Sequence, residues 1–182
     1  MPFIKTDFPD LVIFEPRIFE DERGYFYESF NANTFVEAGI TRPFVQDNQA
    51  LSSYGVLRGL HYQVGEFAQA KLVRVIQGEV LDVVVDIRPD SPMYGKSFGV
   101  ILSEENKKQM YVPRGFAHGY VVLSETAVFF YKCDNFYSKE SEGGLLFNDP
   151  KLGIDWQIDV EKAILSEKDV IQPVFGAHRK FF

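Results

Sequence analysis

Short strand-forming segments separated by turn residues recur along most of this 182-residue chain, and they limit its fold more than any other feature. The clearest segment is residues 80–87, where apolar side chains at every second position face one way while Asp82 and Asp86 face the other. Strands spaced about 8–12 residues apart, with turns between them, are typical of a β-sandwich or a β-barrel. We therefore predict an all-β fold of one of these two types.

The other predicted strands share β-branched and aromatic residues and turn-forming flanks. They cover residues 11–16, 24–30, 71–76, 97–102, 109–112, 119–123 and 127–133. Gln77 and Gly78 predict a hairpin turn that joins the 71–76 strand to the 80–87 strand. Only two short helices are expected, at residues 31–39 and near residues 166–169. The only tryptophan, Trp156, indicates that the C-terminal segment packs against the rest of the chain.

Length and composition predict one domain that spans residues 1–182. Hydrophobic residues make up 46% of the chain, which is enough for a sizeable core without a covalent staple. The lone Cys133 rules out an intramolecular disulfide and is typical of a reducing compartment. We find no secretory signal and no apolar run of the roughly 18 residues that a membrane span needs. A cytoplasmic protein with no membrane contact is therefore expected.

The charge balance argues against a nucleic-acid partner. The net charge is −7, from 19 basic and 26 acidic residues, whereas binding to DNA or RNA needs a basic face. A local cluster of arginine and lysine can still bind an anionic small ligand. The sequence contains no glycine-rich dinucleotide or P-loop motif and no Gly-x-Ser-x-Gly elbow. These absences give no support to a nucleotide cofactor or a serine hydrolase.

Two histidine motifs carry candidate chemistry. Arg58 and His61 are three positions apart and would face opposite sides of a regular strand, so Gly59 is expected to mark a bulge that re-aims them. Histidine is the side chain most often used for proton transfer near neutral pH, but the pattern alone leaves structural roles open for His61 and His118. Gln63 stands where metal-binding cupins usually carry a second histidine, so a metal site is disfavoured.

Other polar and aromatic residues are ambiguous when taken singly. Tyr131, Lys132 and Tyr137 lie near the end of an apolar strand, where the pattern favours a core role for the aromatic rings. The segments 21–28 and 46–48 offer polar recognition groups, although each segment alone is typical of a turn.

Taken in order, a set of these segments resembles the dTDP-4-dehydrorhamnose 3,5-epimerases. A single motif is weak, whereas the ordered set is specific and runs from about residue 3 to about residue 170. The matching segments are residues 19–30, 45–48, 55–63, 68–74, 113–119, 131–137, 148–150 and 165–169. The sequence departs from the family pattern at Gly65, Glu66, Arg114 and Phe147, and none of these departures removes a catalytic group.

The resemblance implies an antiparallel jelly-roll β-sandwich of the cupin-like type, a homodimer, a dTDP-4-keto-6-deoxy sugar as substrate, and neither metal nor other cofactor. It implies that His61 is the general base, that Asp169 orients and polarises it, that Tyr131 is the acid on the opposite face, and that Lys71 stabilises the enolate oxygen. Tyr137 matches the residue that stacks on the thymine ring. The remaining positions match substrate contacts: Arg23, Glu28, Gln46, Asp47, Asn48, Arg58, His118, Glu142 and Lys168.

These residue types suit the implied chemistry. Inversion of a carbon beside a ketone needs a base on one face, an acid on the other, and a donor at the oxygen where enolate charge develops. His61, Tyr131 and Lys71 supply one group of each kind, and C3 and C5 of the sugar both flank the C4 ketone. Three alternatives stay open: an epimerase that acts at C3 only, a nucleotide-sugar-binding module without catalysis, and a metal-dependent cupin enzyme.

Overall fold

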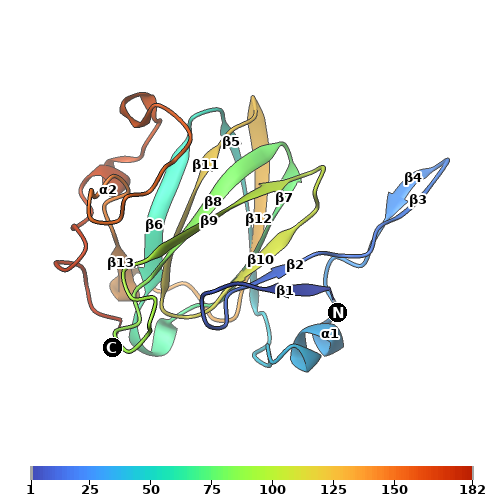
Figure 1. The fold of residues 1–182 in the computed structure, drawn as a ribbon, viewed down its shortest axis with the longest axis horizontal. Coiled ribbons are helices and arrows are strands. Elements are labelled where there is room, and N and C mark those ends of the chain that lie inside the picture. Colours follow the sequence, from blue (N-terminus) through green and yellow to red (C-terminus); the bar gives the residue numbers. More distant parts are fainter. Residues whose placement is uncertain (1, 182) are drawn as a thin grey trace.

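Two antiparallel sheets face each other in the computed structural model, which describes residues 2–181 (Figure 1). The six-stranded sheet has the order β1 (Phe3–Lys5), β2 (Val12–Phe14), β10 (Gln109–Val112), β7 (Lys71–Gln77), β12 (Thr126–Cys133) and β5 (Gln46–Ser53). The five-stranded sheet has the order β13 (Glu142–Gly144), β6 (Leu57–Gln63), β11 (Phe116–Val122), β8 (Glu79–Asp86) and β9 (Ser97–Ser103). The predicted all-β sandwich is confirmed.

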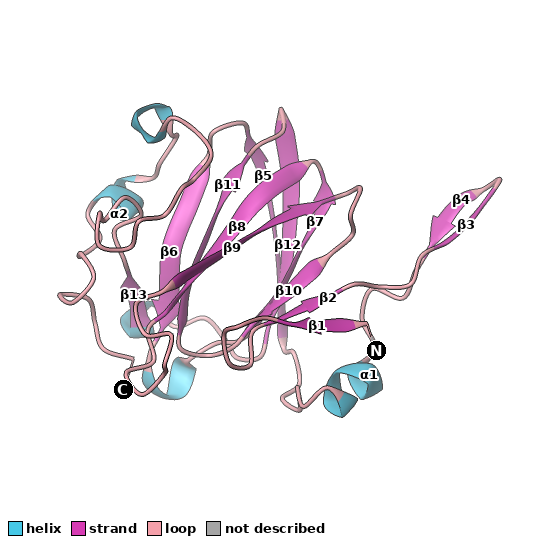
Figure 2. Ribbon diagram, in the orientation of Figure 1, coloured by secondary structure: helices cyan, strands magenta, loops and turns pink. Residues whose placement is uncertain are grey.

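Helices are few and short, as Figure 2 shows, and they lie outside the two sheets. The α-helices are α1 (Ala32–Glu37) and α2 (Glu167–Val170), close to the two predicted positions. Residues 2–181 also include the 3₁₀ turns η1 (Gly65–Phe67), η2 (Lys139–Ser141) and η3 (Val160–Lys162). Among residues 2–181, no helix is long and apolar enough to cross a membrane.

The predicted hairpin at Gln77 and Gly78 is wrong. Strand β7 belongs to the six-stranded sheet and β8 to the five-stranded sheet, so the chain crosses from one layer to the other at this turn. Gly78 has φ of +79°, and a Cβ atom there would lie 2.1 Å from the Thr126 carbonyl oxygen. Only glycine fits the crossing. A tight glycine turn marks a reversal in the sequence but does not say which sheet receives the next strand.

The alternation predicted for residues 80–87 is confirmed, and both faces of β8 are buried. Val80 and Val84 pack between the sheets, whereas Leu81 and Val83 join a second apolar cluster on the outer face of the five-stranded sheet. The C-terminal segment, orange to red in Figure 1, covers this outer face. Its Trp156 is 1% exposed and donates a hydrogen bond from Nε1 to the Phe147 carbonyl oxygen at 2.9 Å.

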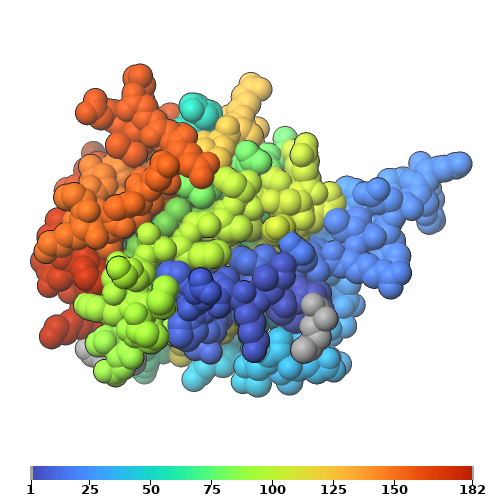
Figure 3. All heavy atoms as spheres, in the orientation of Figure 1, coloured from blue at the N-terminus to red at the C-terminus, as the bar shows by residue number. Residues whose placement is uncertain are grey.

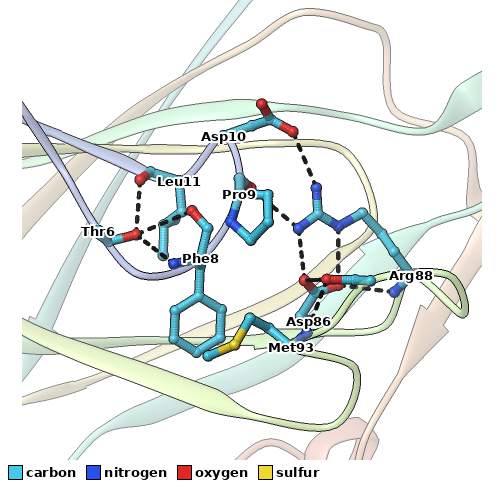
Figure 4. A network of polar contacts seen from close by, with 9 residues as sticks. Thr6, Phe8, Pro9, Asp10, Leu11, Asp86, Arg88 and Met93 are labelled. Atoms are coloured by element: carbon cyan, nitrogen blue, oxygen red, sulfur yellow. Dashed lines mark hydrogen bonds and ion pairs between the residues drawn. The ribbon is translucent and has the colours of Figure 1, made fainter.

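A buried ion pair closes one end of the sandwich (Figure 4). The Asp86 carboxylate is fully buried and accepts hydrogen bonds from Arg88 Nε at 3.0 Å, Arg88 Nη2 at 2.6 Å and Ser91 Oγ at 2.6 Å. Arg88 also reaches Asp10 Oδ2 at 3.3 Å and the Pro9 carbonyl oxygen at 3.1 Å. The loop between β1 and β2 is thereby fixed to the end of β8.

A hairpin of β3 (Phe19–Asp21) and β4 (Gly24–Phe26) stands away from the body, on the side opposite α2 (Figures 1 and 3). The predicted 24–30 strand therefore ends at Phe26. Phe19, Tyr25 and Phe26 are 50%, 58% and 70% exposed, so this arm carries large apolar side chains in solvent.

Candidate active site

A cavity of about 460 Å³ lies between the two sheets. Strands β6 and β11 form one wall, β5, β7 and β12 form the other, and the segment leading into α2 closes one side. Its apolar lining includes Val56, Leu57 and Phe129. Many of the polar groups predicted from the sequence meet here: Arg58, His61, Lys71, His118, Tyr131 and Asp169.

His61 and Asp169 form a close pair at the edge of this cavity. His61 Nε2 lies 2.6 Å from Asp169 Oδ1, and the side chains are 31% and 3% exposed. Because an ionised carboxylate only accepts hydrogen bonds, Nε2 carries a proton, and in the neutral imidazole Nδ1 has the lone pair. This arrangement leaves His61 able to take a proton from a group in the cavity.

The surroundings of Asp169 favour its ionised form. Burial acts to raise the pKa of Asp169, but hydrogen bonds from His61 and Ser166 outweigh it, and the pKa is lowered. Ser166 Oγ donates to Asp169 Oδ2 at 2.8 Å. The carboxylate is therefore held at both oxygens.

Tyr131 and Lys71 approach the cavity from the opposite sheet. They lie on β12 and β7, and Lys71 Nζ is 5.5 Å from the centroid of the Tyr131 ring. Burial, helped by Cys133 and Tyr120, raises the pKa of Tyr131 to about 12, so the phenol keeps its proton. Burial lowers the pKa of Lys71. An imidazole on one wall thus faces a phenol and a lysine amine on the other.

The irregularity predicted at Gly59 is confirmed. The pairing of β6 with β11 shifts register between His118 and Tyr120, opposite Gly59, and this shift lets both Arg58 and His61 line the cavity. Gly59 has φ of +133°, and a Cβ atom there would lie 2.5 Å from Gly119 Cα. The two strands approach too closely for any side chain at this position.

His118 is held from behind by a buried carboxylate. Its Nε2 lies 2.9 and 3.0 Å from the two Asp82 oxygens, and Asp82 has no exposed surface. Burial raises the pKa of Asp82, and the bonds to His118 oppose that rise. His118 is 6% exposed and forms part of the cavity wall.

A second polar group lies beyond this cavity, where β5 begins. Gln46 Nε2 donates to Asn48 Oδ1 at 3.2 Å, and the backbone N–H of Tyr137 donates to Gln46 Oε1 at 3.1 Å. Asp47 alternates to the other face of β5, where it pairs with Lys132 at 3.0 Å. The structure therefore brings Gln46, Asn48 and Tyr137 together and leaves Asp47 apart from them.

The remaining predicted contacts divide into two places. Lys168 on α2 and Glu142 on β13 form an ion pair at 2.5 Å close to the Asp169 end of the cavity. Arg23 and Glu28 lie on or just after the projecting hairpin, where Arg23 pairs with Asp21 and Glu28 accepts a bond from Asn31 at 3.1 Å. Neither reaches the cavity of its own chain (Figure 1).

Three residues that the sequence did not single out belong to the site. Asp82 could have been found from the sequence, since it is a carboxylate inside an otherwise apolar strand. Ser166 could also have been found from the sequence, since it falls in a Ser-x-x-Asp pattern at a predicted helix start. No pattern in the sequence points to Tyr120, which is 5% exposed and lines the cavity with its hydroxyl near Ser52 and Arg58.

The four departures from the family pattern lie outside this cavity. Arg114 pairs with Asp134 at 2.9 Å, and Phe147 packs with Trp156 in the outer apolar cluster. Gly65 and Glu66 lie in the η1 turn. Within the described part of the chain, no group of three or more His, Cys, Asp or Glu side chains is arranged to hold a metal ion.

Comparison with known proteins agrees with this geometry. The family model for dTDP-4-dehydrorhamnose 3,5-epimerase matches residues 5–176. A dTDP-4-dehydrorhamnose 3,5-epimerase from Shigella flexneri is 56% identical over 93% of each chain. The crystal structure of the enzyme from Elizabethkingia anophelis is 60% identical over 95% of each chain, with a TM-score of 0.92. A Legionella pneumophila 3,5-epimerase solved with dTDP-4-keto-L-rhamnose is 53% identical over 94% of this chain and 91% of its own, with a TM-score of 0.90. The chain therefore belongs to the dTDP-4-dehydrorhamnose 3,5-epimerase family.

Proposed function

We propose that this enzyme inverts C3 and C5 of dTDP-4-dehydro-6-deoxy-D-glucose and gives dTDP-4-dehydro-L-rhamnose. One observation carries the assignment of roles: His61 and Tyr131 enter the cavity from opposite sheets. A sugar ring bound between them would present one face to a base and the other to an acid, which is the arrangement that inversion requires.

Each inversion takes two proton transfers. His61 Nδ1 removes the proton from the carbon beside the ketone, and the C–H electrons form the enolate, with negative charge on the C4 oxygen. Lys71 donates a hydrogen bond to that oxygen, which stabilises the charge as it develops. Tyr131 then protonates the carbon from the opposite face, and the enolate returns to the ketone. The proton on His61 and the phenolate of Tyr131 are reset by exchange with solvent.

The polar groups around the cavity support binding of a nucleotide diphosphate. Arg58 carries a guanidinium group suited to phosphate oxygens, and His118 is fixed beside it by Asp82. The Glu142–Lys168 ion pair lies next to Asp169, which supports a contact with the substrate. Tyr137, 55% exposed beside Gln46 and Asn48, is suited to stack on the thymine ring.

A homodimer would complete the site. The hairpin that carries Arg23 projects from the body, and its exposed apolar residues favour contact with another surface. We propose that Arg23 and Glu28 contact the substrate held by a partner subunit, because they lie apart from the cavity of their own chain.

We also propose that residues 1–182 act as one domain in the cytoplasm. Trp156 belongs to the same apolar cluster as Leu81 and Val83 of β8, which supports a single domain. The lone, buried Cys133 supports a reducing compartment.

The decisive experiment is incubation of the purified protein with dTDP-4-dehydro-6-deoxy-D-glucose in D₂O, without added cofactor or metal. Proton NMR follows loss of the C3 and C5 signals, and the next reductase of the pathway with NADPH traps the product. We expect deuterium at both carbons and dTDP-L-rhamnose as the trapped product. Deuterium at C3 alone would identify a C3-only epimerase, and binding without exchange would identify a non-catalytic binding module.

A further inference from the structure

Ser166 occupies the N-cap of α2, three residues before Asp169. A Ser-x-x-Asp pattern at a helix start is expected to form a capping box, in which the serine Oγ accepts a hydrogen bond from the backbone N–H three residues on. Ser166 makes no such side-chain cap bond. Its hydroxyl instead donates to Asp169 Oδ2 at 2.8 Å. The group that would ordinarily cap the helix is bound to the carboxylate of the site.

Both oxygens of Asp169 are thereby occupied. Oδ1 lies 2.6 Å from His61 Nε2, and Oδ2 accepts from Ser166. The Asp169 side chain is only 3% exposed, so water competes little for either oxygen. A carboxylate held at two points cannot rotate about its Cβ–Cγ bond, and Oδ1 therefore stays directed at the imidazole.

The charged and titratable groups near Asp169 come from three elements. His61 comes from β6, Glu142 from β13, and Glu167 and Lys168 from α2 itself. Lys168 and Glu142 are bonded to each other at 2.5 Å. The Ser166 hydroxyl is uncharged and binds Asp169 directly, so its removal changes the hydrogen bonding of that carboxylate without removing a charge.

We propose that Ser166 is a positioning residue for the epimerase reaction: its hydroxyl holds Asp169 in the orientation that keeps His61 Nε2 protonated and Nδ1 free as the base. The proposal rests on the proposed function, since it requires that His61 remove the substrate proton. Ser166 acts through Asp169 and His61 and takes no part in proton transfer.

Removal of the hydroxyl has two expected consequences. The Asp169 carboxylate loses one of the donors that fix it and keeps those from His61 and the Ser166 backbone, so kcat falls about tenfold, a part of the 10²–10⁴-fold that a positioned base supplies. One hydrogen bond that favours the ionised carboxylate is also lost, so the pKa of Asp169 rises toward its ordinary value. The acidic limb of the kcat profile then moves to higher pH. KM is expected to change little, because Ser166 carries no charge for the diphosphate.

Three substitutions separate positioning from helix capping. Ser166→Ala removes the hydroxyl, Ser166→Gly removes it while keeping a residue that is tolerated at an N-cap, and Ser166→Thr retains it. We expect the alanine and glycine variants to lose kcat equally and to shift the acidic limb equally. The threonine variant should keep most of the wild-type kcat and the acidic limb of the wild type.

Ser124→Ala is the matched control. The Ser124 hydroxyl also holds structure, since it accepts from the Glu79 backbone N–H at 2.8 Å and donates to the Thr126 carbonyl at 2.7 Å, but it does not line the cavity. This variant should lower Tm without moving the pH profile.

The measurements are kcat, KM and the pH profile of C3 and C5 deuterium exchange for the wild type and each variant. If Ser166→Gly is folded and keeps the wild-type kcat and acidic limb, Ser166 has no positioning role. Wild-type protein that exchanges neither proton would instead refute the proposed function, so the two failures are distinguishable.

Discussion

His61 Nε2 and Asp169 Oδ1 lie 2.6 Å apart although 108 residues separate them in the chain. One residue stands on β6 and the other on the four-residue helix α2, and each is held by its own element. The pair stands at the wall of the cavity, and the predictions below begin from it.

Asp169→Asn should leave the fold intact and lower kcat by about 10²–10⁴-fold. The asparagine amide can donate to His61, which favours the tautomer with the proton on Nδ1 and removes the lone pair from the cavity side. Steady-state kinetics with the reductase-coupled assay will measure the loss, and circular dichroism will check the fold. A kcat within threefold of the wild type would contradict the assigned tautomer.

Tyr131→Phe should separate proton removal from inversion. Because His61 is unaffected, exchange of substrate protons with D₂O is expected to continue, whereas formation of trapped dTDP-L-rhamnose should fall by about 10²-fold or more. NMR exchange and product trapping in the same sample measure both rates. If both rates remain at wild-type level, Tyr131 is a core residue and another group is the acid.

Loss of the Lys71 proton should set the pH at which activity falls on the alkaline side of the pH profile. Its pKa is lowered from 10.5 by burial, whereas that of Tyr131 is raised to about 12, so Lys71 loses its proton first as the pH rises. Activity that needs the ammonium group is present at lower pH and is lost as the pH passes the lowered pKa of Lys71. Lys71→Arg should move this limb upward in whatever activity remains, since arginine stays protonated. If the alkaline limb of Lys71→Arg stays at the wild-type pH, the limb belongs to another group.

Arg88→Ala should destabilise the protein by about 3–5 kcal/mol, because it leaves the fully buried Asp86 carboxylate without its ionic partner (Figure 4). Urea unfolding of the variant and the wild type gives the difference in free energy. Lys162→Ala is the matched control, since its pair with Asp159 is exposed and should contribute less than about 1 kcal/mol. Equal effects of the two substitutions would contradict the importance of burial.

Tyr62→Phe should lower the free energy of unfolding by about 1 kcal/mol, because it removes a buried hydrogen bond. Tyr62 is 5% exposed, and its hydroxyl donates to the Arg179 carbonyl at 2.5 Å. Thermal and urea unfolding of the variant and the wild type will test this. An unchanged free energy of unfolding would contradict the contribution of this bond.

The sequence by itself determined the local structure and the identity of the chemical groups. Alternation in residues 80–87 predicted β8 and its two faces, and Gly59 predicted the irregular step that brings Arg58 and His61 to one cavity. Ordered motifs predicted the family, because residue types at matching positions reflect the reaction that they serve. These are properties of short segments, and short segments are what a sequence displays directly.

Only the tertiary structure decided how those segments meet. The sequence did not reveal that β7 and β8 belong to different sheets, because a glycine turn is compatible with a hairpin and with a crossing between layers. Nor did it distinguish Asn48, which lies beside Gln46, from Asp47 on the other face of β5. The His61–Asp169 pair depends on atoms brought together from segments 108 residues apart. Burial and hydrogen-bond distance are set by packing between segments, and pairwise packing is not encoded in any one of them.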